Sequence, residues 1–279
     1  MTSRLASFLI VLFAAATAAF PGAEPARPVD GIMDNSFLVE EAYNQEAGVV
    51  QHIFNVVYGV DRVQDAQRHM LNLAFTQEWP VFSQKHQFSY TVPYGFVADR
   101  GQAAHGLGDV LLNYRFQAYL NETSLTAFAP RFSLVLPTGQ DNRGFGNGTL
   151  GYQANLPYST TLTDCWFVHA NAGLTFLPNV GARPSHDLVD YNLGASAIYA
   201  ANERFHLMLE WLGVWSESVA AGGGTQRGFA SLIAPGARYA FNLKHGSQFV
   251  LGLGVPMRLT GRAADLGVFL YASFEHKLH

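Results

Sequence analysis

The chain has 279 residues, of which 49% are hydrophobic and only 14% are charged, and its formal net charge is −4. This charged fraction is well below the roughly 25% of soluble domains, and the lack of a basic excess excludes an electrostatic footprint for nucleic acid. Cys165 is the single cysteine, which excludes an internal disulfide and a cysteine cluster around a metal ion.

The N-terminal residues have the pattern of an export signal. One basic residue, Arg4, precedes an apolar run over 5–20 that contains small residues at 16–18, so we predict a cleaved signal peptide over residues 1–20. A membrane anchor is the alternative. However, the run is shorter than the roughly 20 apolar residues that a spanning helix needs, and Pro21 follows it.

Residues 21–47 are predicted to be an N-terminal periplasmic segment or a plug for the domain that follows. The stretch 34–48 reads DNSFLVEEAYNQEAG. Ser36 can cap a short helix there, or the stretch can form an ordered periplasmic arm. Our hypothesis is that it folds into the periplasmic mouth of a barrel, where its acidic residues meet arginines of the lumen. A disordered tail is the alternative.

From residue 49 onward, every second residue tends to be apolar or aromatic. This period of two is typical of β-strands, because successive side chains in a strand point to opposite faces. In 109–120, for example, Val110, Leu112 and Tyr114 alternate with Asn113 and Arg115. Twelve strands are predicted in this way, over 49–58, 70–79, 87–96, 109–120, 128–136, 152–158, 166–174, 191–199, 205–215, 229–241, 248–258 and 266–277.

The predicted connections alternate between short turns and longer loops. The short turns lie near 83–85, 121–123, 162–164, 202–204 and 244–246, and the loops cover 61–67, 99–106, 139–148, 178–187, 216–226 and 260–265. Outer-membrane barrels have an even number of strands, short periplasmic turns and longer extracellular loops. We therefore predict an all-β fold for residues 48–279, an antiparallel up-and-down transmembrane β-barrel of about 12 strands in the outer membrane of a Gram-negative bacterium.

A soluble barrel or β-sandwich is the structural alternative, because antiparallel sheets in water also alternate apolar and polar residues. The apolar face would then point inward, and a ring of about twelve strands would need much more filling by side chains than a smaller barrel. An apolar face that meets lipid needs no such filling. We therefore expect the bulky aromatic residues to point outward.

The charged residues on the opposite face are candidates for lining a pore. They are Glu78, Asp109, Arg115, Arg131, Glu210, Arg238, Arg258 and Glu275. In a water-filled pore, such residues set the electric field that a permeating solute meets. The alternative is that they pair across neighbouring strands and hold a narrow barrel together, and the sequence leaves both open.

No catalytic, cofactor-binding or metal-binding motif stands out, so we expect neither an enzyme nor a bound cofactor or metal. The ten histidines are scattered and lack the close spacing of metal ligands, so each is expected to be a bystander. Residues 144–148 are glycine-rich but lack the strand–loop–helix context of a phosphate site. They are expected to form a flexible extracellular loop.

Four stretches carry a resemblance to a known family. They are DNSFLVEEAYNQEAGVVQHIFN (34–55), GLGDVLLNYRFQ (106–117), APRFSLVLPTGQDNRGFGNG (129–148) and LGVFLYASFEHKL (266–278). Together they resemble the outer-membrane proteins of the MetA-pathway phenol-degradation family, which are labelled as transporters. The resemblance covers essentially the whole mature chain. It implies an outer-membrane barrel that passes small aromatic or other hydrophobic compounds, and it implies no catalytic residues.

The C terminus departs from the pattern of many outer-membrane proteins. Those chains end in an aromatic residue that aids barrel assembly, whereas this one ends in Lys277, Leu278 and His279. The barrel assembly machinery is nevertheless an expected partner, together with outer-membrane lipid and a small-molecule solute.

The leading functional expectation is a channel for passive passage of small molecules. A closed barrel with a structural role, or one whose loops 139–148 and 216–226 bind partners, is the main alternative, and an enzyme acting on membrane lipid is the third. Small residues predicted to face inward, such as Ser133 and Gly252, favour free space in the lumen. Tyr119, Phe167, Phe269 and Tyr271 would obstruct the lumen if they faced inward.

Overall fold

The structure, a computed structural model, describes residues 32, 36–63, 66–181, 185–220, 222–260 and 266–277. The predicted signal peptide lies outside these residues, as do the last two residues of the chain. Within the described ranges, no helix is long and apolar enough to cross a membrane.

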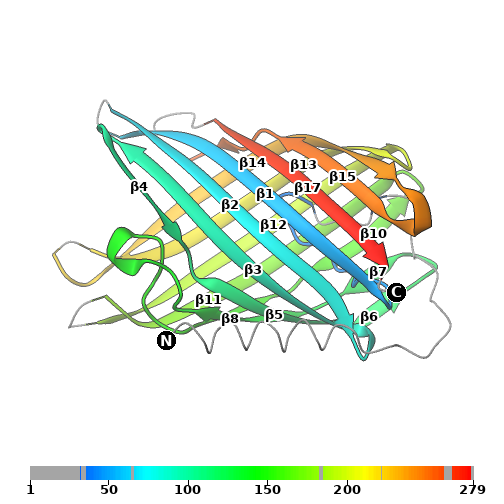
Figure 1. Ribbon diagram of the computed structural model, residues 1–279, viewed down its shortest axis with the longest axis horizontal. Helices are drawn as coiled ribbons and strands as arrows, with labels where there is room; N and C mark the ends of the chain where they lie inside the picture. Colours follow the sequence, from blue (N-terminus) through cyan, green and yellow to red (C-terminus); the bar gives the residue numbers. More distant parts are fainter. Residues whose placement is uncertain are drawn as a thin grey trace.

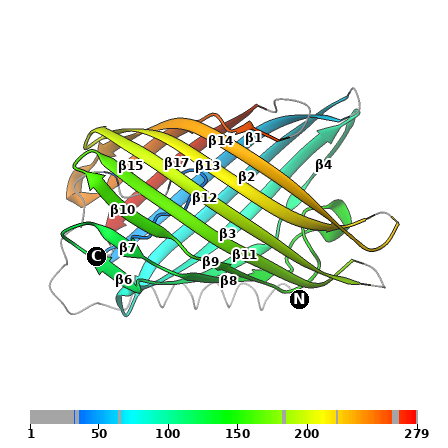
Figure 2. The ribbon, with the colours of Figure 1, turned by 180° about the vertical axis from the view of Figure 1, so that it is seen from behind.

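Antiparallel β-strands form a continuous ring, with two short 3-10 turns between them (Figures 1 and 2). Their bounds are β1 Val49–Val63, β2 Ala66–Val81, β3 Ser83–Asp99, β4 Gln102–Leu107, β5 Val110–Phe116, β6 Tyr119–Asn121, β7 Thr126–Phe128, β8 Arg131–Leu136, η1 Asp141–Arg143, β9 Gly151–Asn155, β10 Tyr158–Thr163, β11 Trp166–Val180, β12 His186–Asn202, β13 Phe205–Val219, β14 Thr225–Asn242, η2 Lys244–Gly246, β15 Gln248–Gly254, β16 Met257–Arg258 and β17 Gly267–Lys277. Since β1 pairs with both β2 and β17, the sheet closes on itself.

The chain crosses the membrane twelve times. The number of strands is larger, 17, because four of the crossings are each divided into two or three shorter strands. One crossing consists of β4, β5 and β6, and the others consist of β7 with β8, β9 with β10, and β15 with β16. The predicted fold class and strand number are confirmed.

Prolines mark three of the interruptions, because proline has no N–H to donate to a neighbouring strand. Pro130 separates β7 from β8, Pro157 separates β9 from β10, and Pro256 separates β15 from β16. All three prolines still serve as acceptors. The Phe116 N–H donates to the Pro130 carbonyl at 3.0 Å, the Ala129 N–H to the Pro157 carbonyl at 3.1 Å, and the Gly267 N–H to the Pro256 carbonyl at 2.8 Å.

The alternation of residues separates an apolar outer face from a polar inner face. Large apolar side chains such as Phe54, Phe132 and Leu253 point outward and are about half exposed, whereas inward side chains such as Asn113 and Ser196 are polar and buried. A broad apolar surface of this kind is stable against hydrocarbon and unstable against water. The protein is therefore an outer-membrane β-barrel, and a soluble barrel is excluded.

Several connections are tighter than the sequence predicted, because the strands continue beyond the membrane. The predicted loops 61–67 and 99–106 are largely strand, and so are parts of 178–187 and 216–226. The long strands have 15 to 18 residues, whereas a tilted strand needs only about 9–11 to cross a bilayer. The loop bounds were wrong because the ends of these strands lie in water. Both faces of a strand end can then be polar, so the alternation of apolar and polar residues that identifies a strand is missing there.

Candidate functional site

Residues 36–46 lie inside the barrel, against its polar inner face. The described segment contains no helix, so the predicted helix capped by Ser36 is not formed. Instead, the segment runs up from the start of β1 at the periplasmic end, and its side chains Val39, Ala42 and Tyr43 are buried. An extended chain in this position must find partners for each backbone N–H and C=O group, and the barrel wall provides them.

Glu210 of β13 binds three successive backbone N–H groups of the segment. Phe37 and Val39 donate to its carboxylate at 3.1 and 3.0 Å, and Leu38 donates at 2.9 Å. Glu210 itself is fully buried, so these aligned donors take the place of water around its carboxyl group.

Two side-chain amides of the wall bind the main chain through both of their polar atoms. Asn171 of β11 accepts from the Glu40 N–H at 2.7 Å and donates to the Glu40 carbonyl at 2.8 Å. Gln117 accepts from the Asn44 N–H at 3.0 Å and donates to the Ala42 carbonyl at 2.8 Å. Such pairs imitate the bonding of a neighbouring strand, so the wall recognises the peptide backbone of the segment.

The two acidic residues of the segment meet different arginines. Glu40 contacts Arg131 at 2.9 Å and Arg115 at 3.2 Å. Glu41 contacts Arg238 at 3.3 Å, and its carboxylate lies 3.7 Å from His169 Nε2. All of these side chains are buried or nearly so, so the pairs are little screened by solvent.

The two carboxyl groups are perturbed in opposite directions. For Glu40, burial favours the neutral form, but Arg131 and Arg115 outweigh it and hold the pKa below the ordinary 4.5. For Glu41, burial prevails over Arg238 and raises the pKa to about 7. The charged and titratable groups near Glu41 are Arg238, Arg115, His169 and Tyr43, and the Ser36 hydroxyl bonds to it.

We expect the docked segment to become less stable as the pH rises from 4.5 to about 7. A released Glu41 ionises near 4.5, whereas the docked one stays protonated up to about 7, so docking takes up a proton within this window and is favoured at its acidic end. Glu40 contributes to the pH dependence only below this window. Its pKa in the docked segment lies below 4.5, so its stabilising negative charge is lost when the pH falls further. Amide exchange of residues 37–45, corrected for intrinsic rates, measures the effect. Glu41→Gln should reduce the pH dependence, and an unchanged slope would contradict this assignment.

The ring of Phe37 rests on a floor of three inward-facing glycines, Gly236, Gly252 and Gly254. A Cβ atom placed on these glycines would lie 2.6, 2.5 and 2.9 Å from the ring, closer than packed atoms approach. The ring also stacks on Phe269, the cross-strand neighbour of Gly254, with a centroid distance of 5.1 Å. Gly252, which was predicted to leave free space in the lumen, is thus covered by the segment.

The remaining charged candidates lie around this arrangement. Glu78 accepts from Gln87 at 2.6 Å and lies 4.0 Å from Arg115, and Glu275 accepts from Gln45 of the segment at 3.4 Å. Arg258 lies elsewhere, in β16 opposite Leu232. Of the aromatic residues considered as obstructions, Phe269 and Tyr271 are buried, whereas Tyr119 is about half exposed.

Sequence reasoning missed the uncharged partners of the segment. Gln87, Gln117, Ser159 and Asn171 all bind its main chain, and His169, expected to be a bystander, receives or donates a hydrogen bond at Ser159 and faces Glu41. Their signal was present, because Gln87, Ser159 and Asn171 lie on the polar faces of their strands and Gln117 directly follows β5. However, an amide side chain alone does not distinguish a ligand of a peptide from a wall residue.

Asp109 holds the extracellular loop 139–148. Its carboxylate accepts from the backbone N–H groups of Gly139 and Asn147 at 2.9 and 2.8 Å, and from the Asn147 side chain at 2.9 Å. The loop carries Phe145 onto the inner face of Gly95 and Gly106. It is therefore folded inward over the lumen, in contrast to the flexible loop expected from its glycines.

Replacing Asp109 by alanine is expected to loosen this loop. Each hydrogen bond to a charged group contributes about 1.5–3 kcal/mol, so amide exchange across 139–148 should rise by at least about tenfold. Hydrogen–deuterium exchange with mass spectrometry measures it. Asp141→Ala is the matched control, since that carboxylate accepts from the adjacent Asn142. Equal exchange in both variants would show that other contacts hold the loop.

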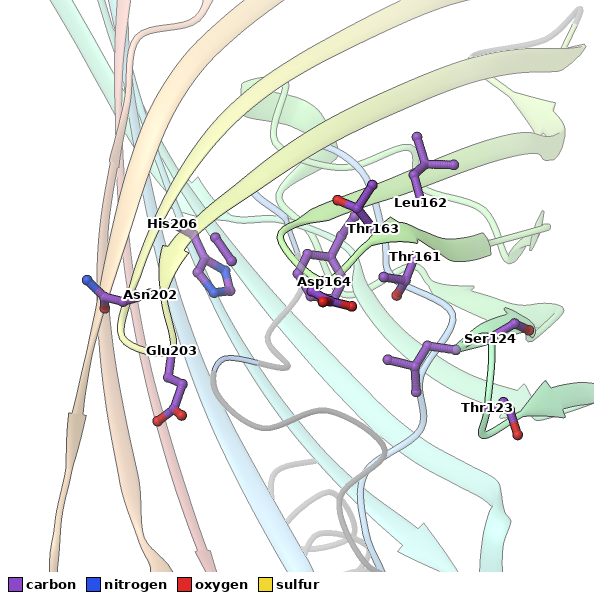
Figure 3. A pocket seen from close by; sticks show the side chains of 12 residues that line it. Thr123, Ser124, Thr161, Leu162, Thr163, Asp164, Asn202, Glu203 and His206 are labelled. Atoms are coloured by element: carbon purple, nitrogen blue, oxygen red, sulfur yellow. The ribbon is translucent and has the colours of Figure 1, made fainter.

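Two cavities lie on opposite sides of the segment. One of about 620 Å³ opens among the short turns at the periplasmic mouth (Figure 3), where Thr123, Asp164 and Glu203 come from three different turns. The other, of about 350 Å³, lies toward the extracellular side and is lined by residues that include Asn192 and Val214. Among the described residues, no group of three or more histidine, cysteine or acidic side chains is placed to hold a metal ion.

No protein-family model and no curated protein matches the chain. Among solved structures, it is similar to the translocator domain of the autotransporter NalP from Neisseria meningitidis, with a TM-score of 0.52, 9% identity, and coverage of 82% of this chain and 88% of that one. It is also similar to the transport unit of the autotransporter AIDA-I from Escherichia coli, with a TM-score of 0.51, 8% identity, and coverage of 88% and 95%. At such identities the likeness shows the fold.

Proposed function

We propose that the protein is an outer-membrane channel for small molecules whose lumen is narrowed by its own residues 36–46. The observation that supports this is the nature of the contacts. Polar side chains of the wall bind the segment through hydrogen bonds and ion pairs, and a cavity lies on either side of it. Such contacts exchange with water more readily than a continuous apolar core.

The solute class follows from the family resemblance, which supports small aromatic or other hydrophobic compounds. The aromatic surface formed by Phe269 and Tyr271 around Phe37 is compatible with such solutes. A permanently closed barrel is the competing proposal, and it is favoured by the fit of Phe37 to its glycine floor. In neither case do we propose an enzyme.

Single-channel recording in planar bilayers tests the proposal. The refolded mature chain is compared with a variant lacking residues 28–47 and with one in which these residues are replaced by a Gly/Ser linker of equal length. We expect several-fold higher conductance from both variants than from the parent. Heat-modifiable migration on gels establishes that each barrel is folded. A folded deletion variant that conducts no ions would overturn the channel.

A further inference from the structure

Two arginines face each other directly on neighbouring strands of the lumen. Arg115 of β5 and Arg131 of β8 are cross-strand partners, and both side chains are largely buried. Like charges in directly opposite positions destabilise a sheet, and buried charges without a counterion do so more strongly. The pair therefore requires an anion between them.

The carboxylate of Glu40 is that anion in the structure. Arg131 Nε donates to both of its oxygens at 3.1 and 2.9 Å, and Arg115 Nη1 donates to Oε1 at 3.2 Å. Asn155 of β9 adds a bond from Nδ2 to Oε2 at 2.7 Å. Three side chains of the wall thus converge on one planar carboxylate with charge-assisted hydrogen bonds, which are stronger than neutral ones.

The donors belong to the wall, whereas the carboxylate belongs to the segment. The wall alone therefore supplies all the donors of a carboxylate site. The carboxylate that occupies this site, that of Glu40, belongs to the segment and not to the wall. The extracellular cavity of about 350 Å³ reaches this site, since Arg131, Asn155 and Glu40 all line it. The same cavity is lined by Leu212 and Val214 beside several asparagines, so it presents an apolar patch next to the polar donors.

We propose that Arg115, Arg131 and Asn155 form a binding site for a small organic carboxylate, which displaces the side chain of Glu40. The ligand carboxylate takes the place of the Glu40 carboxylate, and its organic part lies in the adjoining cavity. This inference rests on the proposed channel function, because the solute reaches the site through the lumen. The proposed solute is then a small hydrophobic compound that also carries a carboxylate group.

A free carboxylate must compete with Glu40 for the site, and Glu40 has the advantage of being attached to the same chain. A group held beside its site by a short stretch of chain acts at an effective concentration in the millimolar range, so a free carboxylate binds the parent protein weakly. Glutamine at position 40 retains the shape of the side chain and removes its charge. The arginines then lack their tethered anion, and a free carboxylate should bind more tightly.

Isothermal titration of the refolded mature chain with sodium propionate tests the site. We expect Glu40→Gln to bind propionate at least tenfold more tightly than the parent, and to bind neutral propionamide no better than the parent does. Adding Arg131→Gln should abolish the gain. Glu41→Gln is the matched control, because it changes the neighbouring carboxyl group, which contacts Arg238 and makes no side-chain hydrogen bond to Arg131 or Asn155, and it should leave the affinity for propionate unchanged.

Several results would overturn the proposal. A folded Glu40→Gln variant that binds propionate no better than the parent would do so, and so would equal gains for inorganic phosphate or for Glu41→Gln. If Glu40→Gln does not refold, Glu40→Asp replaces it, with a smaller gain expected because its shorter side chain withdraws from Arg115. Conductance of the deletion variant is measured separately, so a failed carboxylate site is distinguished from a failed channel.

Discussion

Replacing Arg115 by methionine is expected to raise amide hydrogen exchange across residues 37–45 by about 100-fold, which corresponds to roughly 3 kcal/mol. The guanidinium donates to the Glu41 and Tyr43 carbonyls at 3.0 and 2.7 Å, and to the side chains of Asn44 and Glu40 at 2.8 and 3.2 Å. Methionine preserves the bulk and leaves all four acceptors without this donor. The substitution should destabilise the segment and not the barrel, because the backbone hydrogen bonds of β5 to its neighbouring strands are kept.

The control for this variant is Arg227→Met at the extracellular end of β14. Arg227 also pairs with an acid, Glu217, but 57% of its side chain is exposed, and exposed pairs contribute less than about 1 kcal/mol. Exchange of residues 37–45 should not change in this control. If Arg115→Met likewise leaves exchange unchanged, the segment does not depend on the arginine.

Replacing Phe37 by alanine should release the segment to a similar extent, since truncation of a buried phenylalanine costs about 3–5 kcal/mol. The complementary change, Gly252→Ala, places a methyl group 2.5 Å from the Phe37 ring and should displace it from the other side. Combining the two removes the clash. We therefore expect the double variant to be no less protected from exchange than Phe37→Ala alone, with a coupling of at least about 1 kcal/mol.

The double-variant comparison depends on a glycine control. Gly59 also lies in a strand, and a Cβ added there meets no atom within 4 Å, so Gly59→Ala should not change exchange of the segment. Strictly additive effects of Phe37→Ala and Gly252→Ala would contradict direct packing between ring and floor. Together, the controls separate this contact from a general weakening of the barrel.

The barrel could be predicted from the sequence because its signal is local. A strand such as β5 shows its two faces through alternation alone, with Leu112 and Tyr114 on one side and Asn113 and Arg115 on the other. The charges of the inner face could be named for the same reason. Their partners could not, because the stagger between strands determines which residues meet at one height, and that stagger is a property of the closed ring.

The path of residues 36–46 shows a second limit. Its backbone hydrogen bonds are made with side chains far along the chain, such as Glu210 and Asn171. A periodic pattern within the segment itself therefore cannot predict them. The inward turn of loop 139–148 has a similar origin, since it depends on Asp109 some thirty residues earlier. Glycine-rich composition predicts freedom of the backbone, but not the acceptor that removes this freedom.

The strand that follows the segment is also the strand that closes the ring. β1 pairs with β17 from Val49 to Gly59, and Gln45, just before it, contacts Glu275 of β17. The seam between the first and last strands therefore lies beside the segment, and we expect the ring to close around a chain already in place. Arg115 and Arg131 would then leave water together with the carboxylate of Glu40 that neutralises them. Insertion into the bilayer in this order would avoid the cost of unpaired charges in a low-dielectric interior.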